Sequence, residues 1–204
     1  MTLHLIGSGP HTHTLFTVPR TMMAVIAALA PATGFALYQF GWPAIFLFLV
    51  TLLSAWLFEV ASLWIARRPI APFARDGSAL LTGWLVAMTL PPHAPWWVGV
   101  LGAGIAIVIG KHLFGGLGQN LFNPAMVARA MLVIALPVQM TAWVAPPGLL
   151  NGPDIWQGLA ITFAGAPPVD AVSSASTLGL VQSQLGAGPA WPRLRRRFPT
   201  CAPG

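Results

Sequence analysis

A long apolar run at residues 43–66, PAIFLFLVTLLSAWLFEVASLWIA, constrains the fold of this chain more than any other feature. At 1.5 Å per residue, a helix over this run reaches about 36 Å, enough to cross a hydrocarbon core of about 30 Å with some tilt. Hydrophobic residues make up 56% of the whole chain and charged residues only 7%. A soluble domain carries roughly a quarter charged residues, so the bilayer must form part of the solvent. The sequence therefore predicts an all-α integral membrane protein.

Five apolar segments are expected to form transmembrane helices within a membrane domain over 21–144. They cover 21–38, 43–66, 77–90, 95–113 and 127–144. Pro31 predicts a kink in the first of them. The third is too short to cross unless the bilayer thins or nonhelical backbone extends it. Short or broken helices occur at membrane depth where they line a cavity or pack inside protein.

The basic residues predict the orientation of these helices in a bacterial inner membrane. They precede the first segment, separate the second from the third, or flank the turn between the fourth and fifth: Arg20, Arg67, Arg68, Arg75, Lys111 and Arg129. The opposite loops, 39–42 and 91–95, contain neither Lys nor Arg. The positive-inside rule then places the N-terminal tail, 1–20, in the cytoplasm and residues 145–204 in the periplasm.

Charge and cysteine content exclude several classes of function. The formal charge of +6 does not predict nucleic-acid binding, because the basic residues lie between apolar runs, where they orient helices. Cys201 is the one cysteine, so this chain alone can build neither a disulfide framework nor a cysteine-ligated iron–sulfur cluster. His11 and His13 without further ligands do not predict a metal centre, and no catalytic acid–base pair can be assigned.

Glu59 lies deep in the apolar run 43–66. An ionisable residue inside a membrane helix is costly and marks a functional site by default, here a proton or cation relay in an ion path. The alternative is a structural carboxylate that reaches the cytoplasmic interface or bonds to a neighbouring helix. Asp76 is expected to cap the third helix, and Lys111-His112 to end the fourth at the cytoplasmic interface.

Two polar segments interrupt the apolar pattern. GGLGQNLFNP, 115–124, is either an ordinary cytoplasmic loop or a broken-helix region at membrane depth, and it lacks the ending of a phosphate loop. DAVSSASTLG, 170–179, gathers an aspartate, three serines and a threonine. Such residues favour turns and helix N-caps, so this segment is compatible with a capped short helix. No histidine lies near enough in sequence to activate one of its hydroxyls.

The residues of three blocks carry a resemblance to a known family: ARDGSALLTGWLVAMTLPP (74–92), GKHLFGGLGQNLFNPAMVARA (110–130) and DAVSSASTLG (170–179). Together they resemble the RnfD subunit of the Rnf ion-translocating electron-transport complex. They are similar, more distantly, to the NqrB subunit of the sodium-pumping NADH:quinone reductase. The resemblance covers about residues 10–185. It implies that the five helices are the N-terminal half of a ten-helix fold, followed by an extracytoplasmic loop over 145–185.

The resemblance also implies a covalent cofactor. In that family a flavin transferase attaches FMN through its phosphate to a hydroxyl of a D-x-x-S-x-A-T segment outside the membrane. The matching positions here are Asp170 and Ser173, followed by Ser176 where the family has threonine, and Thr177 stands one residue later. Either Ser176 or Thr177 would carry the phosphoester, or the segment is unmodified.

Further implications of the resemblance concern the complex. Electrons pass between reduced ferredoxin and NAD through flavins and iron–sulfur centres in several subunits, coupled to ion movement, and such complexes supply low-potential electrons, for example to nitrogen fixation. The first of the two polar segments would form a tight region near a cofactor or helix interface, through Gly115, Gly116, Gly118, Asn120 and Asn123. The alternatives are a flavin-free transporter or channel subunit and a fragment that cannot assemble.

The end of the chain, 186–204, departs from the family pattern. Fourteen of its 19 residues are Gly, Ala, Pro or Arg, and its four arginines lie on the face predicted to be outside. We hypothesise that residues from about 186 or 190 onward are read out of frame. The alternative is a short form whose basic tail meets anionic lipid headgroups.

Overall fold

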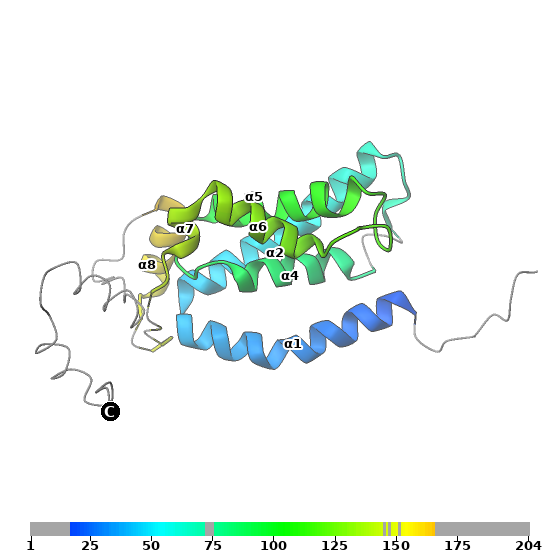
Figure 1. Ribbon diagram of the computed structural model, residues 1–204. Helices are drawn as coiled ribbons and strands as arrows, with labels where there is room; N and C mark the ends of the chain where they lie inside the picture. Colours follow the sequence, from blue (N-terminus) through cyan, green and yellow to red (C-terminus); the bar gives the residue numbers. More distant parts are fainter. Residues whose placement is uncertain (1–16, 72–75, 145, 147, 151, 166–204) are drawn as a thin grey trace, which may run out of the picture.

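The computed structural model describes residues 17–71, 76–144, 146, 148–150 and 152–165. In this part of the chain every regular element is helical, which confirms the predicted all-α class (Figure 1). The elements are α1 (Val18–Phe40), α2 (Trp42–Ile65), α4 (Ser78–Thr89), α5 (Trp96–Gly104), the π-helix η1 (Ile105–His112), α6 (Pro124–Ala135), α7 (Pro137–Thr141), α8 (Ile155–Leu159) and the π-helix η2 (Ala160–Ala164).

Within the described ranges, two helices are long and apolar enough to cross a membrane by length and composition, namely α1 with 23 residues and α2 with 24. Both have a proline in their first turn, where the missing N–H costs nothing. Gly41 separates them and has a φ of 77°, a left-handed value that glycine adopts without strain. The chain can therefore turn back on itself within one residue. The first helix continues through Pro31.

The other apolar helices are shorter, and one expected helix is divided. We expected a single helix over 127–144, but α6 begins at Pro124 and ends at Ala135, and α7 follows from Pro137. Leu136 between them leaves the helical region, with φ −131° and ψ 57°. Pro137 favours this break, because its ring disfavours the helical conformation for the preceding residue. The third expected helix is present as the 12-residue α4.

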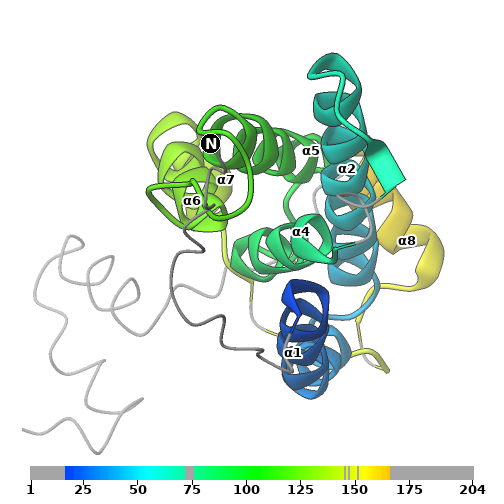
Figure 2. The same cartoon turned by 90° about the vertical axis from the view of Figure 1, so that its right-hand side faces the viewer.

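The short helix α4 lies in the middle of the bundle. Viewed along the bundle axis in Figure 2, it has α1, α2, α5 and α6 around it, and it contacts all four. Close approach depends on small residues: a Cβ added to Gly83 of α4 would lie 2.6 Å from Cβ of Ala55 in α2. Likewise a Cβ on Gly110 of η1 would lie 2.9 Å from Cα of Pro124. Small residues at such contacts are typical of helix packing in membranes.

The segment after α7 is more structured than the loop expected over 145–185. Gly148 and Leu149 donate backbone hydrogen bonds to the carbonyls of Gln39 and Tyr38 at the end of α1. Asp154 and Gln157 form a capping box that starts α8, which contacts α2. This part of the predicted loop therefore packs on the helical bundle at the end opposite the α2 C-terminus (Figure 1).

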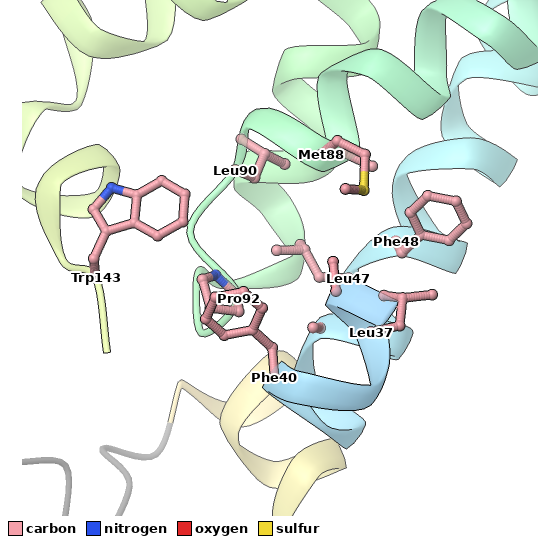
Figure 3. Close-up of a pocket in the computed structure, with 11 residues that line it drawn as sticks. Leu37, Phe40, Leu47, Phe48, Met88, Leu90, Pro92 and Trp143 are labelled. Carbon is pink, nitrogen blue, oxygen red and sulfur yellow. The ribbon is translucent and has the colours of Figure 1, made fainter. Parts of the chain in front are cut away.

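A small apolar cavity of about 60 Å³ lies at the same end (Figure 3). Its walls come from α1, α2, the α4 end and the segment after α7, and its lining includes Leu37, Phe40, Leu47, Met88 and Trp143. No charged side chain lines it. This cavity therefore has none of the groups that could hold an ion, and it is not the candidate functional site.

Candidate functional site

Glu59 faces the inside of the bundle. It lies two turns before the end of α2, and only 1% of its surface is exposed, whereas Trp56 and Leu57 on the same helix are about half exposed. One apolar helix therefore turns large hydrophobic side chains outward and its single carboxylate inward. A carboxylate can be buried in this way only when other groups of the protein bind it.

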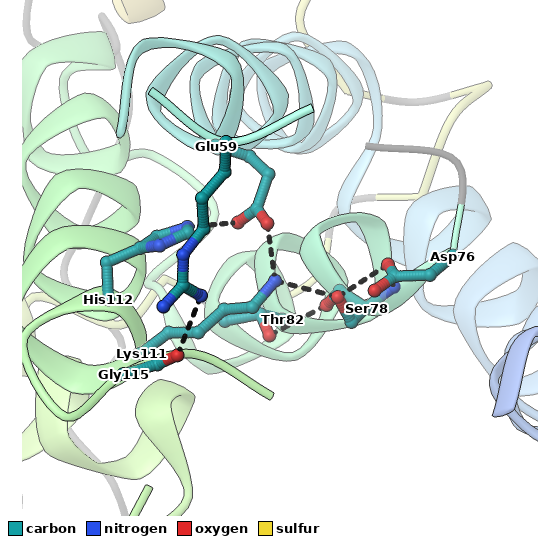
Figure 4. Close-up of polar contacts among 8 residues, drawn as sticks. Glu59, Asp76, Ser78, Thr82, Lys111, His112 and Gly115 are labelled. Atoms are coloured by element: carbon teal, nitrogen blue, oxygen red, sulfur yellow. Dashed lines mark hydrogen bonds and ion pairs between the residues drawn. The ribbon is translucent and has the colours of Figure 1, made fainter. Parts of the chain in front are cut away.

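Two consecutive residues at the end of η1 bind the Glu59 carboxylate (Figure 4). The ammonium of Lys111 lies 2.8 Å from Oε1, and Nε2 of His112 lies 3.0 Å from Oε2. Lys111 is as buried as its partner, with 2% exposure, and His112 is mostly buried. The residues reach Glu59 from a π-helical segment, and such segments are rare and often occur at functional sites.

The N-terminus of α4 completes the cluster. Lys111 also donates to Oγ of Ser78 at 2.7 Å, and that hydroxyl donates to Oδ1 of Asp76 at 2.6 Å. The same Oδ1 accepts the backbone N–H of Ser78, the first residue of α4. Asp76 therefore binds the helix N-terminus as the sequence suggested, but from the position before the N-cap residue, which is Gly77. Its neighbour Arg75 lies outside the described residues. We refer to Glu59, Asp76, Ser78, Lys111 and His112 together as the Glu59 cluster.

A cavity of about 220 Å³ opens beside the Glu59 cluster. This volume exceeds by more than tenfold the roughly 10–15 Å³ that one water molecule requires. Four of the five cluster residues line it. The rest of its wall comes from the end of α2 and from the segment 115–124, which we call the glycine-rich segment: Leu63, Arg68, Gly115, Gly116, Leu117 and Gln119. The guanidinium of Arg68 donates to the carbonyl of Gly115 at 3.0 Å, which ties the glycine-rich segment to the end of α2.

Apolar residues follow the cluster along each of its three elements. Ala55, Ala79, Ala103 and Ile107 form a buried hydrophobic group on which Phe58 packs. Ala55 is one turn from Glu59 along α2, Ala79 adjoins Ser78, and Ile107 is one turn from Lys111. The cluster therefore has a cavity beside it and buried apolar residues one turn away along α2 and η1.

The structure brings together two candidates that the sequence treated separately. Gly115 and Gly116 share a cavity with Glu59, and their φ values of 108° and 103° belong to conformations that glycine favours. Gly118 also has a positive φ, of 89°. Asn123 accepts the backbone N–H of Ala125 at 3.0 Å and so caps α6, which accounts for its place in the sequence without a cofactor.

The remaining sequence candidates divide into two groups. Asn120 has a buried side-chain oxygen without a hydrogen-bond partner among the described residues. The candidate attachment segment lies outside the described residues, with its four members Asp170, Ser173, Ser176 and Thr177. For these four the flavin prediction rests on the sequence.

Sequence reasoning missed the role of Lys111 and His112. We expected them to end a helix at the cytoplasmic interface, and they do end η1, but Lys111 is buried against Glu59 instead of facing the interface. The signal that could have found the pair is charge balance: an intramembrane carboxylate needs a cation, and Lys111 is the only lysine in the sequence.

Comparison with known proteins shows the family of the chain. The model of the NQR2, RnfD, RnfE family matches residues 5–200. The chain belongs to this family. It is 72% identical over 186 residues to the RnfD subunit of the ion-translocating oxidoreductase complex of Rhodobacter capsulatus, covering 91% of this chain and 52% of that protein. The RnfD subunits of Halorhodospira halophila and Stutzerimonas stutzeri are 49% and 52% identical, covering 89% and 84% of this chain and 51% and 49% of theirs.

The chain spans about half the length of these curated relatives. Family membership and the apolar helices α1 and α2 identify it as a membrane protein. The predicted resemblance to RnfD is thereby confirmed at the level of the family.

Proposed function

We propose that this chain is a membrane subunit of an Rnf-type ion-translocating electron-transport complex in a bacterial inner membrane. Its partners would be the other subunits of that complex, and the electrons would pass between ferredoxin and NAD. Support comes from the family model and from relatives that are named as RnfD subunits of an ion-translocating oxidoreductase complex.

The observation that carries the ion-translocating part of the proposal is the buried Glu59 carboxylate beside a polar cavity. Glu59 is 1% exposed and is bound by two side chains of η1. A structural role alone would be met more simply by apolar residues, since replacing a buried ion pair by well-packed hydrophobic side chains is often neutral or stabilising. We therefore assign Glu59 to the ion path.

The ion-path assignment is tested in the whole complex reconstituted into vesicles. In the Glu59→Gln variant, electron transfer from reduced ferredoxin to NAD should continue while the ion gradient that accompanies it collapses. Arg129→Gln is a matched control, because Arg129 is exposed on α6 and away from the cavity. Full coupling in Glu59→Gln would remove Glu59 from the path.

We further propose that Ser176 or Thr177 carries FMN through a phosphoester, made by a flavin transferase on the periplasmic side. The support is the match of 170–179 to the family's attachment segment. Bound there, FMN would supply electron transfer in one- or two-electron steps. The polypeptide would supply the accepting hydroxyl, with the small neighbours Ser174 and Ala175 leaving access for the transferase.

A denaturing gel viewed under ultraviolet light tests the flavin proposal, because covalent flavin fluoresces in the protein band. The chain is co-expressed with a flavin transferase, and the variants Ser176→Ala and Thr177→Ala are compared with the control Ser174→Ala. Loss of fluorescence in one variant identifies the hydroxyl. Absence of fluorescence in the unaltered chain, with ion movement intact, would favour a flavin-free transporter subunit instead.

A further inference from the structure

We propose that the Glu59 cluster is a protonation site, in which His112 takes a proton from the adjacent cavity and Glu59 accepts it. The ion handled at this end of the chain is then H⁺ and not a metal cation. This inference rests on the proposed function, because it names the ion for the path to which Glu59 was assigned.

The geometry disfavours a metal cation, because both oxygens of Glu59 are already used. Oε1 accepts from Lys111 at 2.8 Å, and Oε2 is bound to Nε2 of His112 at 3.0 Å. Hard cations such as Na⁺ require several oxygen ligands. A cation at Glu59 would displace an N–H donor and would lie beside a buried ammonium, which repels it. In the described residues, moreover, no group of three or more His, Cys, Asp or Glu side chains could hold a metal ion.

The charges of the cluster favour uptake of one proton. Glu59 and Asp76 face a single ammonium, that of Lys111, so the cluster carries one net negative charge when His112 is neutral. One added proton makes the cluster neutral. Arg68 also lines the cavity, but it is exposed and its guanidinium is bound to the Gly115 carbonyl. Among the described residues, these groups are the charged side chains that face Glu59 or its cavity from α2, the start of α4 and η1.

The contacts allow the proton to move in one balanced step. A proton from water in the cavity binds Nδ1 of His112, the ring nitrogen turned away from Glu59. The proton on Nε2 then passes across the 3.0 Å contact to Oε2 of Glu59. The ring returns to its neutral form, Glu59 becomes a neutral carboxylic acid, and Lys111 remains an ammonium bound to Oε1 and to Ser78.

In this proposal the Glu59 cluster exchanges protons with one side of the membrane only. The cavity lies at the end of α2 beside Arg68, the end predicted to face the cytoplasm, and His112 lines it. One turn before Glu59 in α2 and one turn before Lys111 in η1, the buried residues Ala55 and Ile107 are apolar and offer no group that could carry a proton further. The Glu59 cluster is therefore a cytoplasmic proton-loading chamber within the ion path.

Infrared difference spectroscopy of the purified complex tests the protonation site directly. Lowering the pH should produce a protonated-carboxyl C=O band that shifts in D₂O. Glu59→Gln should abolish this band, whereas Asp76→Asn should retain it but move its appearance to lower pH, because the cluster then carries one negative charge fewer. Adding Na⁺ at constant pH should not change it. Persistence of the band in Glu59→Gln, or its loss on adding Na⁺, would overturn the proposal.

Transport in vesicles tests the role of His112. The variant His112→Gln keeps a side-chain N–H for Glu59 but cannot relay a proton, so redox-driven proton uptake should fall roughly 100-fold, the lower end of what a positioned proton-transfer group contributes. His93→Gln is the matched control, because His93 lies in the loop after α4, at the far end of that helix. Sodium-dependent transport that survives His112→Gln would refute the proton assignment and leave the proposed function intact. Absence of any redox-driven ion movement in the unaltered complex would refute the proposed function, while the infrared test still decides the protonation site.

Discussion

Replacing Lys111 by methionine should be one of the most destabilising single changes in the chain. The substitution keeps much of the aliphatic bulk and removes the ammonium, which leaves Oε1 of a carboxylate that is 1% exposed without its 2.8 Å partner. Removing one member of a buried ion pair costs about 3–5 kcal/mol. His112 still binds Oε2, so we expect a loss near the lower end, about 3 kcal/mol. At about 2–4 °C per kcal/mol for a chain of this size, the melting temperature should fall by roughly 6–12 °C.

The measurement is unfolding of the purified chain in detergent micelles, followed by the fluorescence of its nine tryptophans. Arg129→Met is the matched control, since it removes an exposed positive charge and should change the free energy of unfolding by no more than about 0.5 kcal/mol. The double variant Glu59→Met, Lys111→Met replaces the whole pair by apolar side chains and should recover most of the loss. A Lys111→Met variant as stable as the control, or a double variant that loses the sum of the two single effects, would refute the reasoning.

Three other changes test the packing, a helix cap and a buried histidine. Gly83→Ala should destabilise the bundle by about 1–3 kcal/mol, because the new Cβ lies 2.6 Å from Ala55, whereas Gly34→Ala meets no atom within 4 Å and should be neutral or slightly stabilising in the same unfolding assay. Asn123→Ala should cost about 1 kcal/mol through loss of the α6 cap, and Asn123→Ser should retain most of that stability. Burial lowers the pKa of His93 below 6.5, so the unfolded chain takes up the proton first as the pH falls; the free energy of unfolding should then decrease below about pH 6.5 and continue to decrease until the lowered pKa is passed. In His93→Gln this part of the pH dependence should be absent, and an unchanged pH profile would contradict the assignment.

Hydropathy was sufficient to predict the helical class and the long helices, because lipid requires every backbone polar group to be satisfied within the helix. Hydropathy did not predict helix boundaries that depend on the local backbone conformation. Pro137 is visible in the sequence, but Leu136 retains a backbone hydrogen bond to Leu132 while leaving the helical region, and this combination depends on packing. The helix α8 was missed because, with η2, it covers only ten residues, Ile155–Ala164, too few for a predicted transmembrane helix.

Only part of the candidate site could be predicted from the sequence, because its contacts depend on how the helices pack. Glu59 is conspicuous because it is a lone carboxylate in an apolar run, but its partner Lys111 is 52 residues away in the sequence. Sequence spacing gives no information on a contact of that kind, since it depends on how α2 and η1 pack. A lysine at the end of an apolar run is also the usual sign of a membrane interface, so the local pattern favoured the wrong environment for Lys111.

The position of the Glu59 cluster gives a physical reason for the short length of α4. A helix of 12 residues rises only about 18 Å, well below the thickness of a hydrocarbon core. It begins at Ser78, and Ser78 lies beside Glu59, which is itself six residues before the end of α2. The first N–H of α4, that of Ser78, is bound by Asp76, which also lines the cavity. The start of α4 thus supplies the hydroxyl that holds Lys111, and Asp76 just before it lines the cavity. The helix that looked too short to cross the bilayer therefore ends where the buried carboxylate needs polar partners.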